Sequence, residues 1–200
     1  MDINDSWKIV CGVIERESRS ISESIKNLNK SEFFKAVKAI SEAPLVVTTA
    51  CGTSSMAAMK FTHLLCCIER PSRYLSPEEA VHGGLGCVHS KDVVVIISKG
   101  GMSQELTPIL SIAKFRGASV IVLTENDCTA LAHDADILLL FSSSKEVDNN
   151  HILATSSFSA ALAILDSIIC VLIDMIGFDC KKFALVHPNG AVGSKLNKDN

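Results

Sequence analysis

The chain has 200 residues, which is enough for one domain with a sizeable hydrophobic core. Hydrophobic residues make up 48% of it and charged residues 20%, a balance that argues against intrinsic disorder. Nineteen basic residues against 22 acidic ones give a formal net charge of −3, and aromatic residues are only 5%, so we expect no nucleic-acid partner.

The first 42 residues are predicted to form two helices. Apolar side chains recur at helical spacing from Trp7 to Leu28 and make one stripe, which the segment 27–30 interrupts. Ser31 is expected to cap a second helix with its own apolar face, and Pro44 closes this section.

From residue 45 onward, short apolar runs alternate with helical patterns. The clearest strand is predicted at 93–97, because five β-branched residues in a row suit a strand buried on both faces. This order predicts a parallel sheet with helices on both faces, whose ligands bind at the carboxyl ends of the strands, near the point where the strand order reverses. The other predicted strands are 45–49, 73–75, 120–123 and 137–140, and the predicted helices include 103–116 and a short one near Ala130.

The segment 158–176 is apolar and long enough to span a bilayer, with roughly 19 residues at about 1.5 Å each. It carries Asp166 and Asp174, and each would cost about 2.5–3.5 kcal/mol at the centre of a membrane helix. The two carboxylates are eight residues apart and share a helical face. We therefore interpret the segment as a buried helix with one solvated edge and expect no membrane partner.

Eight cysteines raise the question of disulfides or a metal site. None belongs to a C-x-x-C pair, and most lie inside apolar runs such as 64–68, so we interpret them as small buried hydrophobic residues in a reducing compartment. Residues 1–6 lack the basic and apolar regions of a signal peptide. We expect a cytoplasmic protein.

Two strand-to-helix loops are candidates for binding a phosphate. The loop 48–55 contains Gly52, Thr53 and Ser54, and the loop 97–105 repeats the design after the clearest strand. Glycine lets the backbone approach a ligand, and a helix N-terminus offers free N–H groups to an anion, although a simple capping turn is the alternative for each loop alone. Neither an NTPase loop nor a dinucleotide fingerprint is present.

Four further side chains are candidates for acid–base chemistry. His82 lies in the glycine-rich segment 77–86, although a lone histidine is more often structural. Glu105 begins a helix, where a carboxylate also stabilises the helix dipole. Glu146 precedes a hydroxyl-rich helix start, and His187 lies in a turn with proline and glycine, but nothing local makes either of these specific.

Together these segments resemble the sugar isomerase (SIS) domain family, and within it the arabinose 5-phosphate isomerases. The resemblance implies an α/β fold: a three-layer α/β/α sandwich with a five-stranded parallel sheet, flavodoxin-like, over residues 44–200. The helices of residues 1–43 are expected to pack on this single domain. The family usually forms homotetramers with active sites at subunit contacts. The segments that carry the resemblance are 76–86, 97–105, 145–146 with 155–157, and 183–193.

The resemblance also implies a reaction and a set of site residues. The reaction is the interconversion of ribulose 5-phosphate and arabinose 5-phosphate through an enediol, which needs a base, a donor to the enediolate oxygen and an acid that opens the sugar ring. The acid–base and sugar-contacting positions are His82, Glu105, Glu146 and His187, and the positions that bind phosphate and hydroxyl groups are Gly52, Thr53, Ser54, Ser98, Ser103, Thr155, Ser156 and Ser157.

The chemistry fits these residue types. A carboxylate with a raised pKa can shuttle the proton, and imidazole can open the ring or polarise the carbonyl. We favour Glu146 as the shuttle base, with His187 or His82 assisting. No metal and no cofactor is expected, and the partner is a small-molecule sugar phosphate.

Two departures from the family pattern keep alternatives open. Thr53 stands where the family usually has a lysine, and residues 98–103 read S-K-G-G-M-S in place of S-N-S-G-E-S, so that Lys99 brings the positive charge. The alternatives are an isomerase of a hexulose or amino-sugar phosphate, and a module that binds a sugar phosphate without turnover. The sequence shows no CBS domains, so regulation through such modules is not expected.

Overall fold

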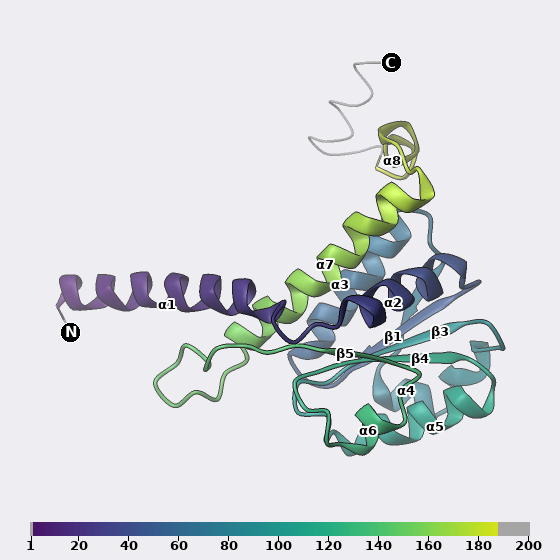
Figure 1. The fold of residues 1–200 in the computed structure, drawn as a ribbon, viewed down its shortest axis with the longest axis horizontal. Helices are drawn as coiled ribbons and strands as arrows, with labels where there is room; N and C mark the ends of the chain where they lie inside the picture. Colours follow the sequence, from purple (N-terminus) through teal and green to yellow (C-terminus); the bar gives the residue numbers. More distant parts are fainter. Residues whose placement is uncertain (1, 188–200) are drawn as a thin grey trace.

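The computed structural model describes residues 2–187 and is built around one five-stranded sheet (Figure 1). All neighbouring strands are parallel, in the order β2-β1-β3-β4-β5. The predicted parallel sheet is confirmed, and each strand lies within one residue of its predicted limits. The strands are β1 (Val46–Ala50), β2 (Ser72–Tyr74), β3 (Val93–Ile97), β4 (Ser119–Thr124) and β5 (Ile137–Leu140).

Helices cover both faces of the sheet and give the expected three layers (Figure 1). One face packs against α2 (Lys30–Glu42), α3 (Ser54–Cys67) and α7 (Ser156–Ile176). The opposite face packs against short helices and turns, which are α4 (Pro77–Val81), η1 (Gly84–Cys87), α5 (Thr107–Phe115) and α6 (Ala130–His133).

Two predicted helix starts are wrong in detail. Ser31 does not cap the second helix, because the side-chain oxygen of Asn29 accepts hydrogen bonds from the N–H groups of Ser31 and Glu32 instead. The helix predicted at 103–116 is divided into the 3-10 turn η2 (Gln104–Leu106) and α5. Pro108 explains the division, since proline fits the first turn of an α-helix and not its interior.

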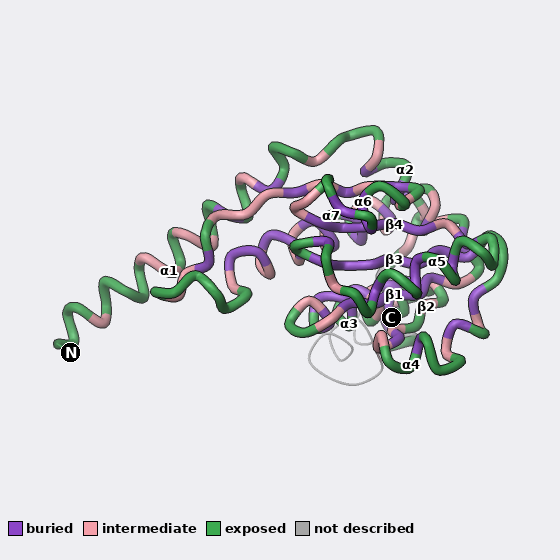
Figure 2. Tube along the Cα trace, turned by 90° about the horizontal axis from the view of Figure 1, so that it is seen from below, coloured by how far each residue is buried: buried purple, intermediate pink, exposed green. Residues whose placement is uncertain are grey.

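Helix α1 (Ile3–Ser24) packs on the domain through its C-terminal half only. There the Ser20 hydroxyl donates to the Ser156 carbonyl at 2.9 Å and accepts from the Ser144 N–H at 3.1 Å. The N-terminal half projects away from the sheet and is exposed along its length (Figures 1 and 2). The predicted apolar stripe is therefore largely uncovered in one chain, and Trp7 is 65% exposed.

Helix α7 is the one helix among residues 2–187 that is long and apolar enough to cross a membrane by length and composition. It lies against α1, α2 and α3, with Ile164, Ile168 and Leu172 buried. Its Asp166 binds the Lys60 ammonium on α3 at 2.6 Å. This is the predicted arrangement of a packed helix with a polar edge, while the cytoplasmic location stays a prediction.

Candidate functional site

The site is positioned by the strand order. The chain leaves β1 for α3 on one face of the sheet and leaves the adjacent β3 for α5 on the other face. The loops after these two strands therefore diverge, and in sheets of this order the crevice at the carboxyl ends of such strands is where ligands bind. The two loops predicted to bind phosphate, 48–55 and 97–105, are the loops at this point.

Glu146 is the most constrained polar side chain at this edge. It follows β5, is only 4% exposed and faces the first turn of α7. Its Oε2 accepts hydrogen bonds from Thr155 N–H at 2.9 Å, Thr155 Oγ1 at 3.0 Å and Ser157 N–H at 3.3 Å. Its Oε1 accepts from Ser157 Oγ and from Lys99 Nζ, the latter at 2.6 Å. Five donors thus satisfy one buried carboxylate.

This environment sets the charge of Glu146. Burial by itself raises the pKa of the carboxyl, but the hydrogen bonds from Lys99, from Ser157 and from the backbone of Thr155 and Ser157 lower the pKa to about 2. The raised pKa expected of a proton-shuttling carboxylate is therefore not found in this arrangement. Glu146 is ionised at neutral pH and is a weak base while all five donors remain in place.

Lys99 connects Glu146 to the two loops. It is the second residue after β3, and its side chain is 44% exposed although its ammonium binds a buried carboxylate. A pocket of about 40 Å³ beside this pair brings together Ser54 of the first loop, Lys99 of the second and Ser157 of α7. Three polar side chains from segments far apart in sequence therefore meet at this pocket, whose other lining residues are apolar.

The two loops keep their shape through particular backbone positions. Gly52 has φ +56° and Gly101 has φ +66°, values that favour glycine. A Cβ at Gly101 would also lie 2.5 Å from the Thr129 hydroxyl oxygen, so the loop leaves no room for a side chain there. Ser98 is buried, and its hydroxyl lies 3.4 Å from that of Ser103.

Cys51 joins the first loop to the second. Burial raises the pKa of its thiol, the Glu105 carboxylate raises it further, and a hydrogen bond with Ser103 opposes both. Glu105 itself is exposed on the turn before α5. Thr53 is exposed at the start of α3 and its side chain makes no cap hydrogen bond.

The hydroxyls at the start of α7 bind Glu146 within the chain, and their predicted contact with a substrate stays a prediction. The hydroxyls of Thr155 and Ser157, predicted to bind the substrate, donate to Glu146. The Ser156 hydroxyl is buried and has no hydrogen-bond partner among the described residues. The Thr155 and Ser157 hydroxyls both donate to the Glu146 carboxylate. Donation from either hydroxyl to a ligand would require it to leave Glu146.

The two histidines predicted to assist Glu146 do not meet it within one chain. His82 is exposed at the end of α4. His187 follows α8 (Cys180–Val186), which lies at the C-terminal end of α7 (Figure 1), whereas Glu146 binds the first turn of α7. Helix α7 has 21 residues and is about 30 Å long, so His187 and Glu146 of one chain lie near opposite ends of this helix.

Two side-chain contacts were not predicted from the sequence. Lys99 was predicted to bring positive charge to the second loop, and the structure pairs its ammonium with Glu146, 47 residues later. Cys67 contacts both His63 and His187, although 120 residues separate Cys67 from His187. The spacing of His63 and Cys67, four residues apart on one helix, is the only local signal of this second group.

Comparison with known proteins agrees with the fold. The sequence matches the SIS domain family over residues 39–171, and the chain belongs to that family. An arabinose 5-phosphate isomerase of Francisella tularensis is 32% identical over 178 residues, which cover 87% of this chain and 54% of that protein. The chain spans about half the length of the curated relatives that it matches.

Solved structures show the same architecture. A candidate sugar-phosphate isomerase from Listeria monocytogenes has a TM-score of 0.91 at 35% identity, covering 94% of this chain and 100% of that one. A protein from Escherichia coli CFT073, solved in complex with arabinose 5-phosphate, has a TM-score of 0.86 at 27% identity, again covering 94% and 100%. The fold predicted from the sequence is confirmed.

The pKa of Glu146 predicts how stability depends on pH. The group binds its proton far more weakly in the folded chain, with a pKa near 2, than in the unfolded chain, near 4.5. Its contribution is therefore fully present above about pH 5 and is lost as the pH falls toward 2. Between about pH 6 and pH 3, the free energy of unfolding should fall by about 2 kcal/mol more in the natural protein than in Glu146→Gln.

Denaturant unfolding of both proteins at the two pH values measures this difference. Glu105→Gln removes an exposed carboxylate near the same edge and is the matched control, which should keep the pH dependence of the natural protein. An equal loss of stability in the natural protein and in Glu146→Gln would contradict the assigned environment of Glu146.

Proposed function

We propose that the chain is a sugar-phosphate isomerase that interconverts ribulose 5-phosphate and arabinose 5-phosphate. The observation that carries this proposal is the buried, ionised Glu146 at the strand-order reversal, paired with the partly exposed Lys99 and next to Ser54. Membership of the SIS domain family and the names of the curated relatives favour the same reaction.

The proposed mechanism depends on a change of partner by Lys99. Aldose–ketose conversion moves a proton between two adjacent carbons through an enediolate. A carboxylate with a pKa near 2 is a poor acceptor for that proton, because efficient general bases have a pKa closer to the working pH. When substrate enters, Lys99 leaves Glu146 and donates instead to the oxygen that carries the negative charge. Loss of that ammonium raises the pKa of Glu146 and makes it the base.

The phosphate is proposed to bind at the two loops. Helix α3 begins at Ser54 and has 14 residues, so the positive end of its dipole and the Ser54 hydroxyl favour an anion at this end. The hydroxyls of Ser98 and Ser103 face the same edge from the loop after β3. Thr53 offers a backbone N–H and a hydroxyl where related proteins usually carry a lysine, which leaves Lys99 as the nearby cation.

Removing the base tests the reaction directly. Glu146→Gln keeps the volume of the side chain and removes the proton acceptor, so turnover should fall by about 100- to 10,000-fold. A coupled assay that follows arabinose 5-phosphate formed from ribulose 5-phosphate measures the change. Lys145→Met alters an exposed lysine next to Glu146 and should leave turnover unchanged. Full activity of Glu146→Gln would remove Glu146 from the reaction.

Lys99 gives a second, independent test through pH. The acidic limb of the kcat/KM profile reports the pKa of the base in the free enzyme. Because the Lys99 ammonium lowers the pKa of Glu146, Lys99→Met should move that limb to higher pH while the rate itself falls. The Lys145→Met profile serves as the reference. A limb that stays in place would show that Lys99 does not control the base.

A second candidate function follows from the same five hydrogen bonds. A carboxylate so fully satisfied, together with Thr53 in place of a lysine, favours a module that binds a sugar phosphate without turnover. Tight binding of arabinose 5-phosphate by the natural protein, with no product formed, would select this function. Turnover of a hexulose or amino-sugar phosphate alone would select an isomerase of another substrate.

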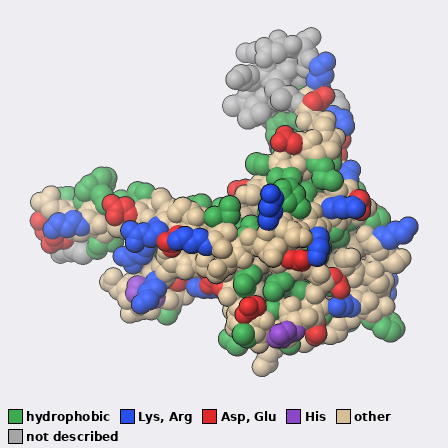
Figure 3. Space-filling view, viewed as in Figure 1, with side chains coloured by type: hydrophobic (Ala, Val, Ile, Leu, Met, Phe, Trp, Pro, Cys, Tyr) green, Lys and Arg blue, Asp and Glu red, His purple; other side chains and the backbone are tan. Residues whose placement is uncertain are grey.

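We also propose that the protein is a homo-oligomer, with the tetramer of the family as the expected form. The projecting half of α1 exposes apolar side chains along its length (Figure 3). At its base lies an apolar groove of about 600 Å³, formed with α2 and α7 and lined by Ile21, Ile25, Phe33 and Phe34. A second copy supplies matching apolar helices for both surfaces. Any function of His187 at a candidate active site would then be at the site of a neighbouring copy in this assembly.

Charge on the exposed stripe should disrupt the oligomer. Ile14 is 62% exposed in one chain, and Ile14→Glu would bury a charge at the proposed contact. Light scattering after size exclusion should show a tetramer for the natural protein and smaller species for the variant. Arg19→Glu changes an exposed residue on another face of α1 and should leave the mass unchanged. A monomeric natural protein would overturn the proposed assembly.

A further inference from the structure

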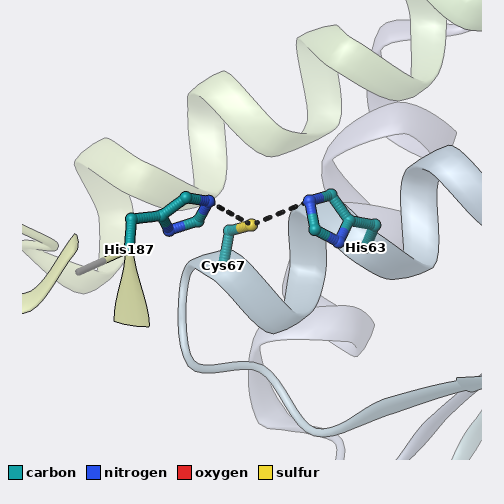
Figure 4. A group of neighbouring side chains, drawn as sticks. All are labelled: His63, Cys67 and His187. Carbon is teal, nitrogen blue, oxygen red and sulfur yellow. Dashed lines mark hydrogen bonds between the residues drawn. The ribbon is translucent and has the colours of Figure 1, made fainter. Parts of the chain in front are cut away.

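A second cluster of reactive side chains lies at the opposite end of α3 from the candidate active site. His63 and Cys67 stand one helical turn apart on α3, and His187 approaches them from the end of α8. The Cys67 sulfur lies 3.5 Å from His63 Nε2 and 3.8 Å from His187 Nε2. Figure 4 shows both imidazoles pointing their Nε2 atoms at the sulfur from opposite sides.

One ion pair ties α8 to the end of α3, and two local contacts order α8 itself. The Phe183 ring stacks on the His187 ring with centroids 3.9 Å apart and planes 13° apart, which fixes the orientation of the imidazole. The Lys182 ammonium lies 3.7 Å from the Glu69 carboxylate, just beyond the end of α3. Asp179 caps α8 by accepting a hydrogen bond from the Lys182 N–H at 3.0 Å. The third side chain of the cluster is therefore brought in by a folded helix.

The three atoms are of the types that bind zinc, and the two sulfur–nitrogen separations match those of a zinc site. Thiolate and imidazole together suit Zn²⁺ among the common divalent ions. Zinc bonds of about 2.3 Å to sulfur and about 2.0–2.1 Å to nitrogen at tetrahedral angles place the two ligand atoms about 3.6 Å apart. The observed separations from sulfur are 3.5 and 3.8 Å, and all three ligand atoms lie within 4.8 Å of one another.

We propose that His63, Cys67 and His187 form a Zn²⁺ site with three protein ligands and one open coordination position. On binding, the Cys67 S–H bond breaks, a sulfur–zinc bond forms and one proton passes to solvent. No oxidant or reductant takes part. The site is separate from Glu146 and needs no sugar phosphate.

A bound metal would connect two segments that are otherwise weakly joined. It would link α8 to α3 and hold the His187 imidazole at Cys67 through its Nε2 atom. The same nitrogen cannot bind a metal and act on a substrate at once. If the oligomer and the isomerase activity proposed above hold, metal occupancy would therefore withdraw His187 from the neighbouring site. This consequence rests on the proposed function, whereas metal binding does not.

Cobalt titration of the metal-free full-length protein tests the site without any substrate. Co²⁺ replaces Zn²⁺ in such sites and gives a sulfur-to-cobalt charge-transfer band with the visible bands of tetrahedral cobalt. We expect one equivalent per chain, displaced by Zn²⁺. Cys67→Ser should lose the charge-transfer band, and His63→Ala should bind Co²⁺ more than about 100-fold more weakly, since changes even outside the ligand set cost 10- to 100-fold.

Matched controls separate this site from the other thiols and histidines. Cys66→Ser removes the neighbouring exposed thiol, which contacts Ser72, and His89→Ala removes an exposed imidazole elsewhere. Both variants should keep the stoichiometry and the band. A band that survives in Cys67→Ser, or that disappears in Cys66→Ser alone, would overturn the proposal.

The natural protein provides a test that does not depend on the folding of a variant. X-ray absorption of its zinc complex should show one sulfur and two imidazole ligands. A spectrum with only nitrogen and oxygen ligands, or the absence of stoichiometric zinc at micromolar metal, would show that the cluster holds thiol–imidazole hydrogen bonds only. Loss of isomerase activity has no bearing on either result, so the two proposals fail independently.

Discussion

The need to satisfy a buried carboxylate organises the candidate active site. A carboxylate removed from water is costly unless charged and polar donors replace the water. Glu146 obtains them from the first turn of α7 and from Lys99, so its burial fixes the loop after β5 to the helix that follows and to the loop after β3. The arrangement that makes Glu146 stable also makes it a weak base, and the catalysis proposed above requires that one donor can leave.

Lys99 is the donor best suited to leave. The Thr155 and Ser157 donors belong to the backbone and short side chains of a helix start and cannot move far. The lysine has a long flexible side chain, nearly half exposed, and approaches from a separate loop. One ion pair can therefore both stabilise the empty site and respond to an anionic ligand, which connects the packing of α7 to the chemistry proposed at the sheet edge.

The two ends of helix α3 have different chemistry. Its N-terminus lies at the loop after β1, where a phosphate is proposed to bind, and its C-terminal turn carries His63 and Cys67 beside α8. His187 belongs to the second end in one chain. In one chain, helix α7 separates His187 from Glu146. A function for this imidazole at the candidate active site therefore depends on the proposed oligomer, whereas a function at Cys67 does not.

The sequence by itself determined the sheet. Runs such as Val93–Ile97 are long, apolar and β-branched, and this local pattern left little freedom in strand position or in fold class. The loops after β1 and β3 were also identified, because glycine and hydroxyl residues follow those strands directly. The family resemblance, carried by four separated motifs, supplied Glu146, which no local pattern singled out.

Only the tertiary structure decided which side chains meet. Lys99 pairs with Glu146 and Cys67 with His187 across 47 and 120 residues, and such pairings depend on strand order, helix length and the direction in which each helix returns along the sheet. The same geometry lowered the pKa of Glu146 and separated His187 from it. Hydrophobic periodicity is a local property that sequence records, whereas the partner and charge of a polar side chain are set by what the fold brings beside it.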